Sequence, residues 1–244
     1  MDSQNQIQET SVSPIPLPVA IILAAGLIAA GLYFGLKSNA GSVGNNAQPP
    51  VQATGNLDSL VAVSADDHIR GDPNAPVKIV EFSDTECPFC KRFHTTMQEV
   101  MDTYGKDGRV AWVYRHLPLD QLHSRARKEA EATECAAELG GNDAFWAYLD
   151  RLMEITPANN GLDPAELPKI AAYVKLDEKK FSECLASGRH AAKIEAQAQN
   201  AAATGGNGTP WSIVVASNGK KFPLSGAQPL EAVKQLIDVA SKEK

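Results

Sequence analysis

The chain has 244 residues, of which 43% are hydrophobic and 21% are charged, and its formal net charge is -6. A chain of this length and hydrophobic content can form a single domain with a sizeable hydrophobic core. The negative charge, with no basic stripe along the sequence, argues against a nucleic-acid-binding protein.

The amino-terminal region predicts a membrane anchor. Residues 1–14 form a short tail, and residues 15–36 contain an apolar stretch long enough to cross most of a bilayer. A cleaved signal peptide is the alternative, because residues 38–40 would suit a peptidase. No Lys or Arg precedes the stretch, however, and this favours retention of the anchor. Residues 37–56 contain Gly, Asn, Gln and Pro and predict a flexible linker.

Residues 57–244 are expected to form the folded domain. Residues 57–63 are predicted to add a short strand. Residues 77–82 predict a buried strand, because they are rich in β-branched and apolar side chains and follow directly after Pro76. A turn comes next, and after it apolar residues recur at helical spacing until Gly105 interrupts the pattern.

Two cysteines, Cys87 and Cys90, lie where this strand gives way to the helix. Free N–H groups and the positive end of the helix dipole stabilise an anion at the first turn, so the pKa of Cys87 should fall below its usual value of roughly 8.5. Cys87 is therefore the expected nucleophile, and Cys90, one turn further on, can resolve a mixed disulfide. Pro88 is tolerated at the first helical turn, where an N–H has no partner to lose.

A structural zinc site is the competing interpretation of two closely spaced cysteines. Zinc usually needs four ligands, and Cys135 and Cys184 are neither paired at short spacing nor accompanied by a His-x-x-x-His arrangement. His94, four residues after Cys90, keeps the zinc interpretation open. Because C-x-x-C after a strand is typical of redox proteins, we expect neither a metal nor a cofactor.

The remaining pattern alternates between strands and helices. Residues 109–116 predict a strand, and a hairpin is predicted around Asn218 and Gly219. The other predicted elements are helices over residues 124–139, 144–154, 164–174, 177–203 and 229–241, and the two hairpin strands over residues 211–216 and 221–224.

Four short segments carry a resemblance to a known family: RGDPNAPV at 70–77, VEFSD at 80–84, CPFC at 87–90 and Gly-Thr-Pro at 208–210. With these segments, residues 66–242 resemble the DsbA-like thiol:disulfide oxidoreductases of the bacterial envelope. The resemblance implies an α/β thioredoxin fold with an α-helical insertion at about residues 120–203. In this chain the fold would be preceded by one N-terminal transmembrane helix.

The resemblance also implies roles for residues outside the cysteine pair. Pro210 would be the cis-proline packed beside the cysteines, and Thr209 would expose its backbone to an extended substrate peptide. Glu81 occupies the place of a buried acid that carries protons as Cys90 ionises. Strand alternation alone allows Glu81 to face solvent equally well.

The residues between the cysteines depart from the family pattern. Strongly oxidising members often have His there, whereas this chain has Phe89, which supplies no positive charge. Lys91 and His94 are the neighbours that could compensate in part. We assign Pro88 and Phe89, together with Thr209, to contact with substrate.

Cys135 and Cys184 lie within helical patterns, and neither has a partner nearby in the sequence. Four cysteines permit three connectivities, and the short loop between Cys87 and Cys90 favours pairing Cys87 with Cys90 and Cys135 with Cys184. Related proteins with a second, non-catalytic disulfide agree with this. Two separate buried thiols are the alternative.

The sequence therefore predicts a membrane-tethered oxidoreductase that introduces disulfides into reduced, partly unfolded proteins. Disulfide chemistry favours an extracytoplasmic catalytic domain, anchored to the cell membrane by a single span. The family implies reoxidation by a membrane partner resembling DsbB or a vitamin K epoxide reductase homologue. A reductase or isomerase of the same fold is one alternative, and a thioredoxin-fold binding or chaperone module with a structural disulfide is another.

Overall fold

The computed structural model describes residues 55–244. The predicted tail, the predicted anchor over residues 15–36 and nearly all of the predicted linker lie outside these described residues. The described part belongs to a compact unit, Pro50–Lys244. Within residues 55–244, no helix has both the length and the apolar character that crossing a membrane requires.

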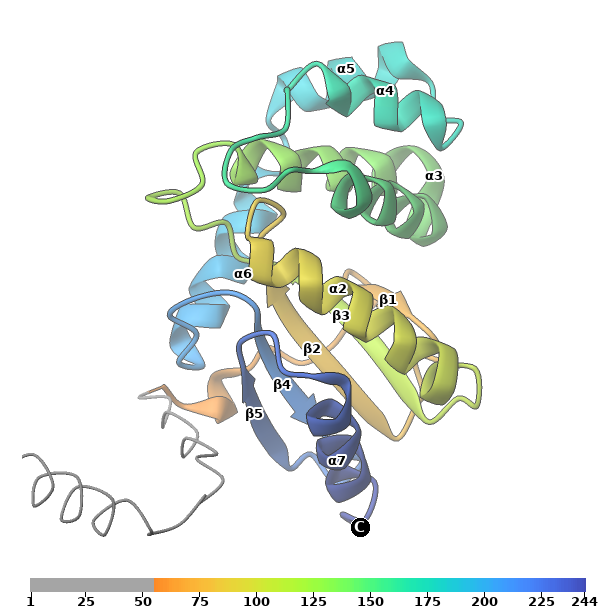
Figure 1. The fold of residues 1–244 in the computed structure, drawn as a ribbon, viewed down its shortest axis with the longest axis vertical. Coiled ribbons are helices and arrows are strands. Elements are labelled where there is room, and N and C mark those ends of the chain that lie inside the picture. Colours follow the sequence, from red (N-terminus) through yellow and green to blue (C-terminus); the bar gives the residue numbers. More distant parts are fainter. Residues whose placement is uncertain (1–54) are drawn as a thin grey trace, which may run out of the picture. The chain divides into compact units, whose positions relative to one another are not determined.

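The described domain is built on a five-stranded mixed sheet (Figure 1). Its strand order is β1-β3-β2-β4-β5, in which only the central β2–β3 pair is parallel. The strands are β1 (His68–Arg70), β2 (Val77–Ser83), β3 (Val110–His116), β4 (Trp211–Val215) and β5 (Lys221–Ser225). The helices are η1 (Leu57–Ser59), α2 (Pro88–Val100), η2 (Met101–Gly105), α3 (Ala126–Ile155), α4 (Glu166–Tyr173), α5 (Glu178–Ser187), α6 (Ala191–Ala203) and α7 (Leu230–Ala240).

The central strand β2 is buried on both faces, which explains its nearly continuous apolar sequence. Val77 and Ile79 pack into a core with α2 and α7, whereas Val80 and Phe82 pack into a second core on the opposite face, with α6. Side chains alternate along a strand, so Glu81 shares the face of Val77 and Ile79. This places a carboxyl group in the core beneath α2.

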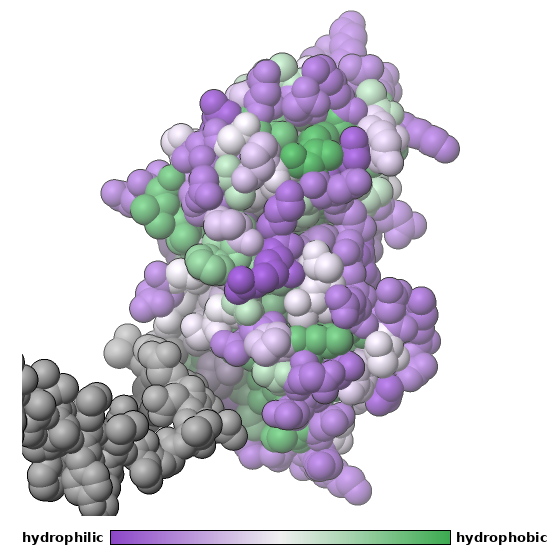
Figure 2. Space-filling view, viewed as in Figure 1, coloured by the Kyte–Doolittle hydropathy of each residue, from purple (hydrophilic) through white to green (hydrophobic). Residues whose placement is uncertain are grey.

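Four helices, α3 to α6, form an insertion between β3 and β4 (Figure 1). The first three, α3 to α5, enclose a separate apolar core that includes Tyr148, Leu152 and Phe181. The visible face of the domain is mostly hydrophilic, with apolar residues in separate patches (Figure 2). Burial of apolar surface within each core therefore accounts for the packing of the insertion as well as of the sheet.

Several predicted elements differ from the structure. Residues 57–63 contain the short helix Leu57–Ser59 and no strand, because the Asn56 side chain accepts a hydrogen bond from the Asp58 N–H and starts a helical turn. The helix predicted over residues 177–203 is divided at Gly188, whose positive φ of 62° ends α5. The edge strand His68–Arg70 was not predicted, since three residues give too little periodicity.

Within the insertion, Cys135 of α3 and Cys184 of α5 form a disulfide, with Cα atoms 5.8 Å apart. The bond closes a loop with a sequence separation of 49 residues. In the chain-entropy model, such a loop restricts the unfolded chain strongly and raises stability. The disulfide thus joins two helices that otherwise meet through side-chain packing.

Replacing both cysteines, Cys135→Ala with Cys184→Ala, should lower the free energy of unfolding by about 4 kcal/mol because the unfolded chain regains its loop entropy. Urea denaturation of the oxidised full chain measures this. The matched double variant Cys87→Ala with Cys90→Ala opens a much shorter loop and should lose less. Equal losses in the two double variants would contradict the entropic account.

Candidate active site

The site is centred on Cys87, which is the N-cap residue of α2. Its backbone is extended, with φ -80° and ψ 121°, and its carbonyl accepts the first helical hydrogen bond, from the Lys91 N–H at 3.0 Å. Pro88 occupies the first helical position, where its fixed φ suits the helix. The sulfur of Cys87 therefore lies beside the free N–H groups of the first turn, as the sequence predicted from its position.

The loop before β4 brings Thr209 and Pro210 against Cys87. The Thr209–Pro210 peptide bond is cis, and the Cys87 thiol donates a hydrogen bond to the Thr209 carbonyl, with sulfur and oxygen 3.5 Å apart. Trp211, the next residue, pairs with Phe82 near the end of β2. The sheet thus holds the two loops that form the site.

The two thiols have opposite ionisation properties. A hydrogen bond from the Cys90 side chain is the largest influence on the pKa of Cys87, which is lowered to about 6. The Thr209 side chain and the N–H groups of Phe89 and Cys90 lower it further, whereas burial opposes the shift. Burial is the main reason that the pKa of Cys90 lies well above its usual value, and the Cys87 and Glu81 charges add to it. One cysteine can therefore be a thiolate at neutral pH while its partner holds a proton.

Glu81 lies in the core on the same sheet face as Ile79, and its side chain is fully buried. The structure therefore excludes the solvent-facing alternative. Its Oε2 accepts a hydrogen bond of 2.8 Å from the indole N–H of Trp112. Burial raises the pKa of Glu81 to about 7, although hydrogen bonds with Ser83 and Trp112 oppose the shift. Glu81 can consequently exchange a proton near neutral pH close to Cys90.

The residues between the cysteines lie on the surface. Phe89 is 54% exposed, and the guanidinium of Arg92 lies 5.3 Å from the centre of its ring. Phe89 adds exposed apolar area next to Cys87. This position suits contact with an unfolded chain, whose apolar side chains are accessible.

Neither of the expected compensating cations supplies charge to Cys87. His94 is buried, its Nε2 lies 2.7 Å from Oδ1 of Asp150, and burial lowers its pKa. Lys91 donates hydrogen bonds to the carbonyls of Glu154 and Thr156 at the end of α3. Both side chains instead form hydrogen bonds that join α2 to the insertion. His94 also does not gather with Cys87 and Cys90 into a cluster of metal-ligating groups among the described residues.

A pair of buried carboxyl groups, Glu86 and Glu129, was missed at the sequence level. Burial and the adjacent Glu86 raise the pKa of Glu129 to about 9, so the pair holds a proton at neutral pH. Glu86 also accepts backbone hydrogen bonds from Asn159 and Asn160, which belong to the loop after α3. Because Glu86 directly precedes Cys87 and Glu129 belongs to α3, the pair links the active-site turn to the insertion. No local pattern around Glu129 distinguishes it from a solvated helical residue.

A sheet of this order, with C-x-x-C at the start of α2 and a cis-proline opposite, defines a thioredoxin-fold oxidoreductase. The family model described as Thioredoxin matches residues 64–239, and the chain belongs to that family.

Solved structures identify the branch of the family. DsbA2 from Pseudomonas aeruginosa is 28% identical with a TM-score of 0.64, and the match covers 75% of this chain and 98% of that one. A thioredoxin-like oxidoreductase from Silicibacter pomeroyi is 27% identical with a TM-score of 0.62, and the match covers 78% of this chain and 99% of that one. The chain is thus a DsbA-like, thioredoxin-fold oxidoreductase.

Curated relatives share the sequence over part of their length. The Na(+)/H(+) antiporter NhaA 3 of Salinispora tropica is 38% identical over 184 residues, which cover 75% of this chain and 26% of the antiporter. NhaA 1 of Salinispora arenicola is 35% identical over 188 residues, which cover 76% of this chain and 26% of that protein. The chain therefore spans about a quarter of the length of the curated relatives it matches.

The pH dependence of alkylation tests the ionisation of Cys87. In the reduced full chain, the rate of reaction with iodoacetamide should reach half its maximum at a pH of about 6, because the thiolate is the reactive form. Cys90→Ala should move this midpoint to higher pH, since it removes the hydrogen bond that lowers the pKa most. A wild-type midpoint near that of an ordinary thiol would contradict the assignment.

Glu81→Gln should change how stability depends on pH. The pKa of Glu81 rises from 4.5 in the unfolded chain to about 7 in the folded one, so the folded state binds the proton more tightly. Stability is then full below pH 4.5 and is lost as pH rises towards about 7. The variant should avoid this loss and exceed wild type by about 3 kcal/mol above neutral pH.

The test of Glu81→Gln uses the oxidised full chain, so that Cys87 and Cys90 do not titrate, and denaturant unfolding at several pH values. Glu99→Gln is the matched control because Glu99 is exposed on α2. Its stability should follow that of wild type. Parallel pH curves for wild type and Glu81→Gln would show that Glu81 does not titrate near neutral pH.

Proposed function

We propose that the chain oxidises pairs of thiols in reduced, partly unfolded proteins by transferring its Cys87–Cys90 disulfide. The observation that carries this proposal is the opposite ionisation of the two cysteines. A Cys87 thiolate that is stable near neutral pH is a good leaving group, and its stability favours the reduced form of the pair. A dithiol that is stable when reduced gives up its disulfide readily to other proteins.

In the proposed reaction, a substrate thiolate attacks Cys87 Sγ, and the bond between Cys87 and Cys90 breaks. The electron pair goes to Cys90, which takes up a proton, and Glu81 is the adjacent acid with a pKa near neutrality. A second substrate thiolate then attacks the substrate sulfur of the mixed disulfide. Cys87 leaves as a thiolate, the substrate gains a disulfide, and two electrons remain on the cysteine pair.

Substrate contact is proposed at three residues around Cys87. The Thr209 backbone lies against the Cys87 sulfur and can pair with an extended peptide by strand-like hydrogen bonds. Pro88 and Phe89, which are both exposed, provide apolar surface next to Cys87. This combination suits unfolded chains of varied sequence, because backbone pairing and an apolar contact require no particular side chain.

The location and the redox partner are also part of the proposal. The apolar stretch in residues 15–36 supports a single-span anchor in the cell membrane, and the chemistry supports an extracytoplasmic catalytic domain. A membrane oxidant resembling DsbB or a vitamin K epoxide reductase homologue would return the pair to the disulfide. The antiporter names of the curated relatives apply to proteins of which this chain matches about a quarter, and we do not extend ion transport to it.

Disulfide transfer to a reduced, unfolded protein tests the function. The oxidised full chain should transfer one disulfide per Cys87–Cys90 pair, and Cys87→Ser should abolish transfer. Reduced Cys90→Ser should instead accumulate a mixed disulfide when its Cys87 thiolate attacks a disulfide-bonded unfolded protein, because no Cys90 thiol is present to resolve the intermediate. The mixed disulfide appears as a band that a reductant removes on gel electrophoresis. Absence of transfer by the wild-type chain, with binding of unfolded protein unchanged in Cys87→Ser, would favour a binding module. Net reduction of a disulfide-bonded substrate by the dithiol form would favour a reductase.

A further inference from the structure

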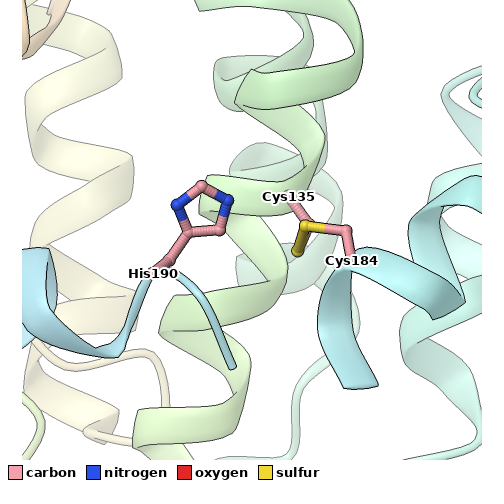
Figure 3. Close-up of side chains that lie close together, drawn as sticks. All are labelled: Cys135, Cys184 and His190. Atoms are coloured by element: carbon pink, nitrogen blue, oxygen red, sulfur yellow. A yellow bond between two sulfur atoms is a disulfide. The ribbon is translucent and has the colours of Figure 1, made fainter. Parts of the chain in front are cut away.

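A second group of potential ligands surrounds the disulfide of the insertion (Figure 3). The sulfurs of Cys135 and Cys184 and a ring nitrogen of His190 all lie within 4.8 Å of one another. The imidazole of His190 faces the sulfur pair from the segment between α5 and α6 (Figure 3). These three side chains come from three different parts of the insertion.

A carboxylate completes the group. Glu138 Oε2 lies 3.0 Å from His190 Nε2 and 3.8 Å from Cys184 Sγ. Glu138 follows Cys135 by three residues on α3, which places both side chains on one face of that helix. Arg189 also binds Glu138, through Oε1 at 3.2 Å, and leaves Oε2 directed towards the sulfurs and the imidazole.

The four side chains have the chemistry of a zinc site, and Glu138 adds its carboxylate beside His190 and Cys184. Two thiolates, an imidazole and a carboxylate are all zinc ligands, and Zn–ligand bonds of about 2.0 to 2.3 Å place neighbouring ligands of a tetrahedron roughly 3.3–3.8 Å apart. The distances from Glu138 to His190 and to Cys184 are already close to this range. The two sulfurs, which are bonded to each other in the disulfide, need to separate.

We propose that reduction of the Cys135–Cys184 disulfide opens a zinc site formed by Cys135, Cys184, Glu138 and His190. A dithiol reductant gives two electrons to the disulfide, becomes a disulfide itself and leaves two thiols on the protein. Binding of Zn²⁺ then forms two Zn–S bonds and releases two protons. The metal replaces the covalent link between α3 and α5, so the insertion keeps its crosslink in either redox state.

The site is accessible from solvent. Glu138 and His190 line an open cavity of about 710 Å³ between α3, α6 and the segment before β1. The cysteines themselves are buried behind them, each 1% exposed. A metal ion can therefore approach through the cavity and meet the oxygen and nitrogen ligands first. This route does not involve Cys87 or Cys90, and the proposal is independent of the proposed function.

Metal binding by the full chain in a Cys87→Ala/Cys90→Ala background tests the proposal, because that background contains only the thiols of the insertion. After reduction with a phosphine under nitrogen, the protein should bind one Zn²⁺ or Co²⁺ per chain, and the oxidised protein should bind none. Bound Co²⁺ should show the absorption of a tetrahedral ion with thiolate ligands. Absence of bound metal after complete reduction would overturn the proposal.

Two variants assign the remaining ligands. Glu138→Gln and His190→Ala should each weaken Co²⁺ affinity at least tenfold, whereas Glu183→Gln, an exposed acid next to Cys184, should have no effect. Unchanged affinity in both ligand variants would overturn the assigned site. If reduction alone unfolds the insertion, Zn²⁺ should restore its helical circular dichroism, and failure to do so would also contradict the proposal.

Discussion

The active site depends on one arrangement, the Cys87 sulfur held at the first turn of α2 and against the Thr209 backbone. A hydrogen bond from the Cys90 side chain lowers the pKa of Cys87 most, and the Thr209 side chain and the N–H groups of the helix add to this effect. Cys90 lies one helical turn further along α2, and its pKa is raised because burial disfavours the ionised form. The difference between the two thiols therefore arises because the buried Cys90 keeps its proton and donates it in a hydrogen bond to Cys87.

The buried acid follows from the same architecture. β2 ends directly before the active-site turn, so a side chain on its α2 face lies beneath the cysteines. Glu81 occupies that position at the expense of stability above neutral pH, since its charge is desolvated there. A carboxyl group that titrates near neutrality next to a high-pKa thiol can serve proton transfer, a role that an apolar residue at this position could not fill.

Local sequence patterns predicted the features that depend on neighbouring residues. The strand β2, the helix that follows Cys87 and the hairpin around Asn218 are examples, since apolar periodicity and turn chemistry specify them directly. The direction of Glu81 required the sheet, because alternation permits two faces. The contacts of Glu86 with Glu129, and of His190 with Glu138, join residues far apart in the chain. Only the packing of the insertion brings them together.

The reduction potential of the full chain tests the central claim most directly. Because the Cys87 thiolate stabilises the reduced form, equilibration with glutathione should give a potential above the roughly -270 mV of thioredoxin. With Phe89 supplying no charge, it should remain below the roughly -120 mV of DsbA. A potential at or below that of thioredoxin would show that the environment of Cys87 does not favour disulfide donation, and it would contradict the proposed oxidase.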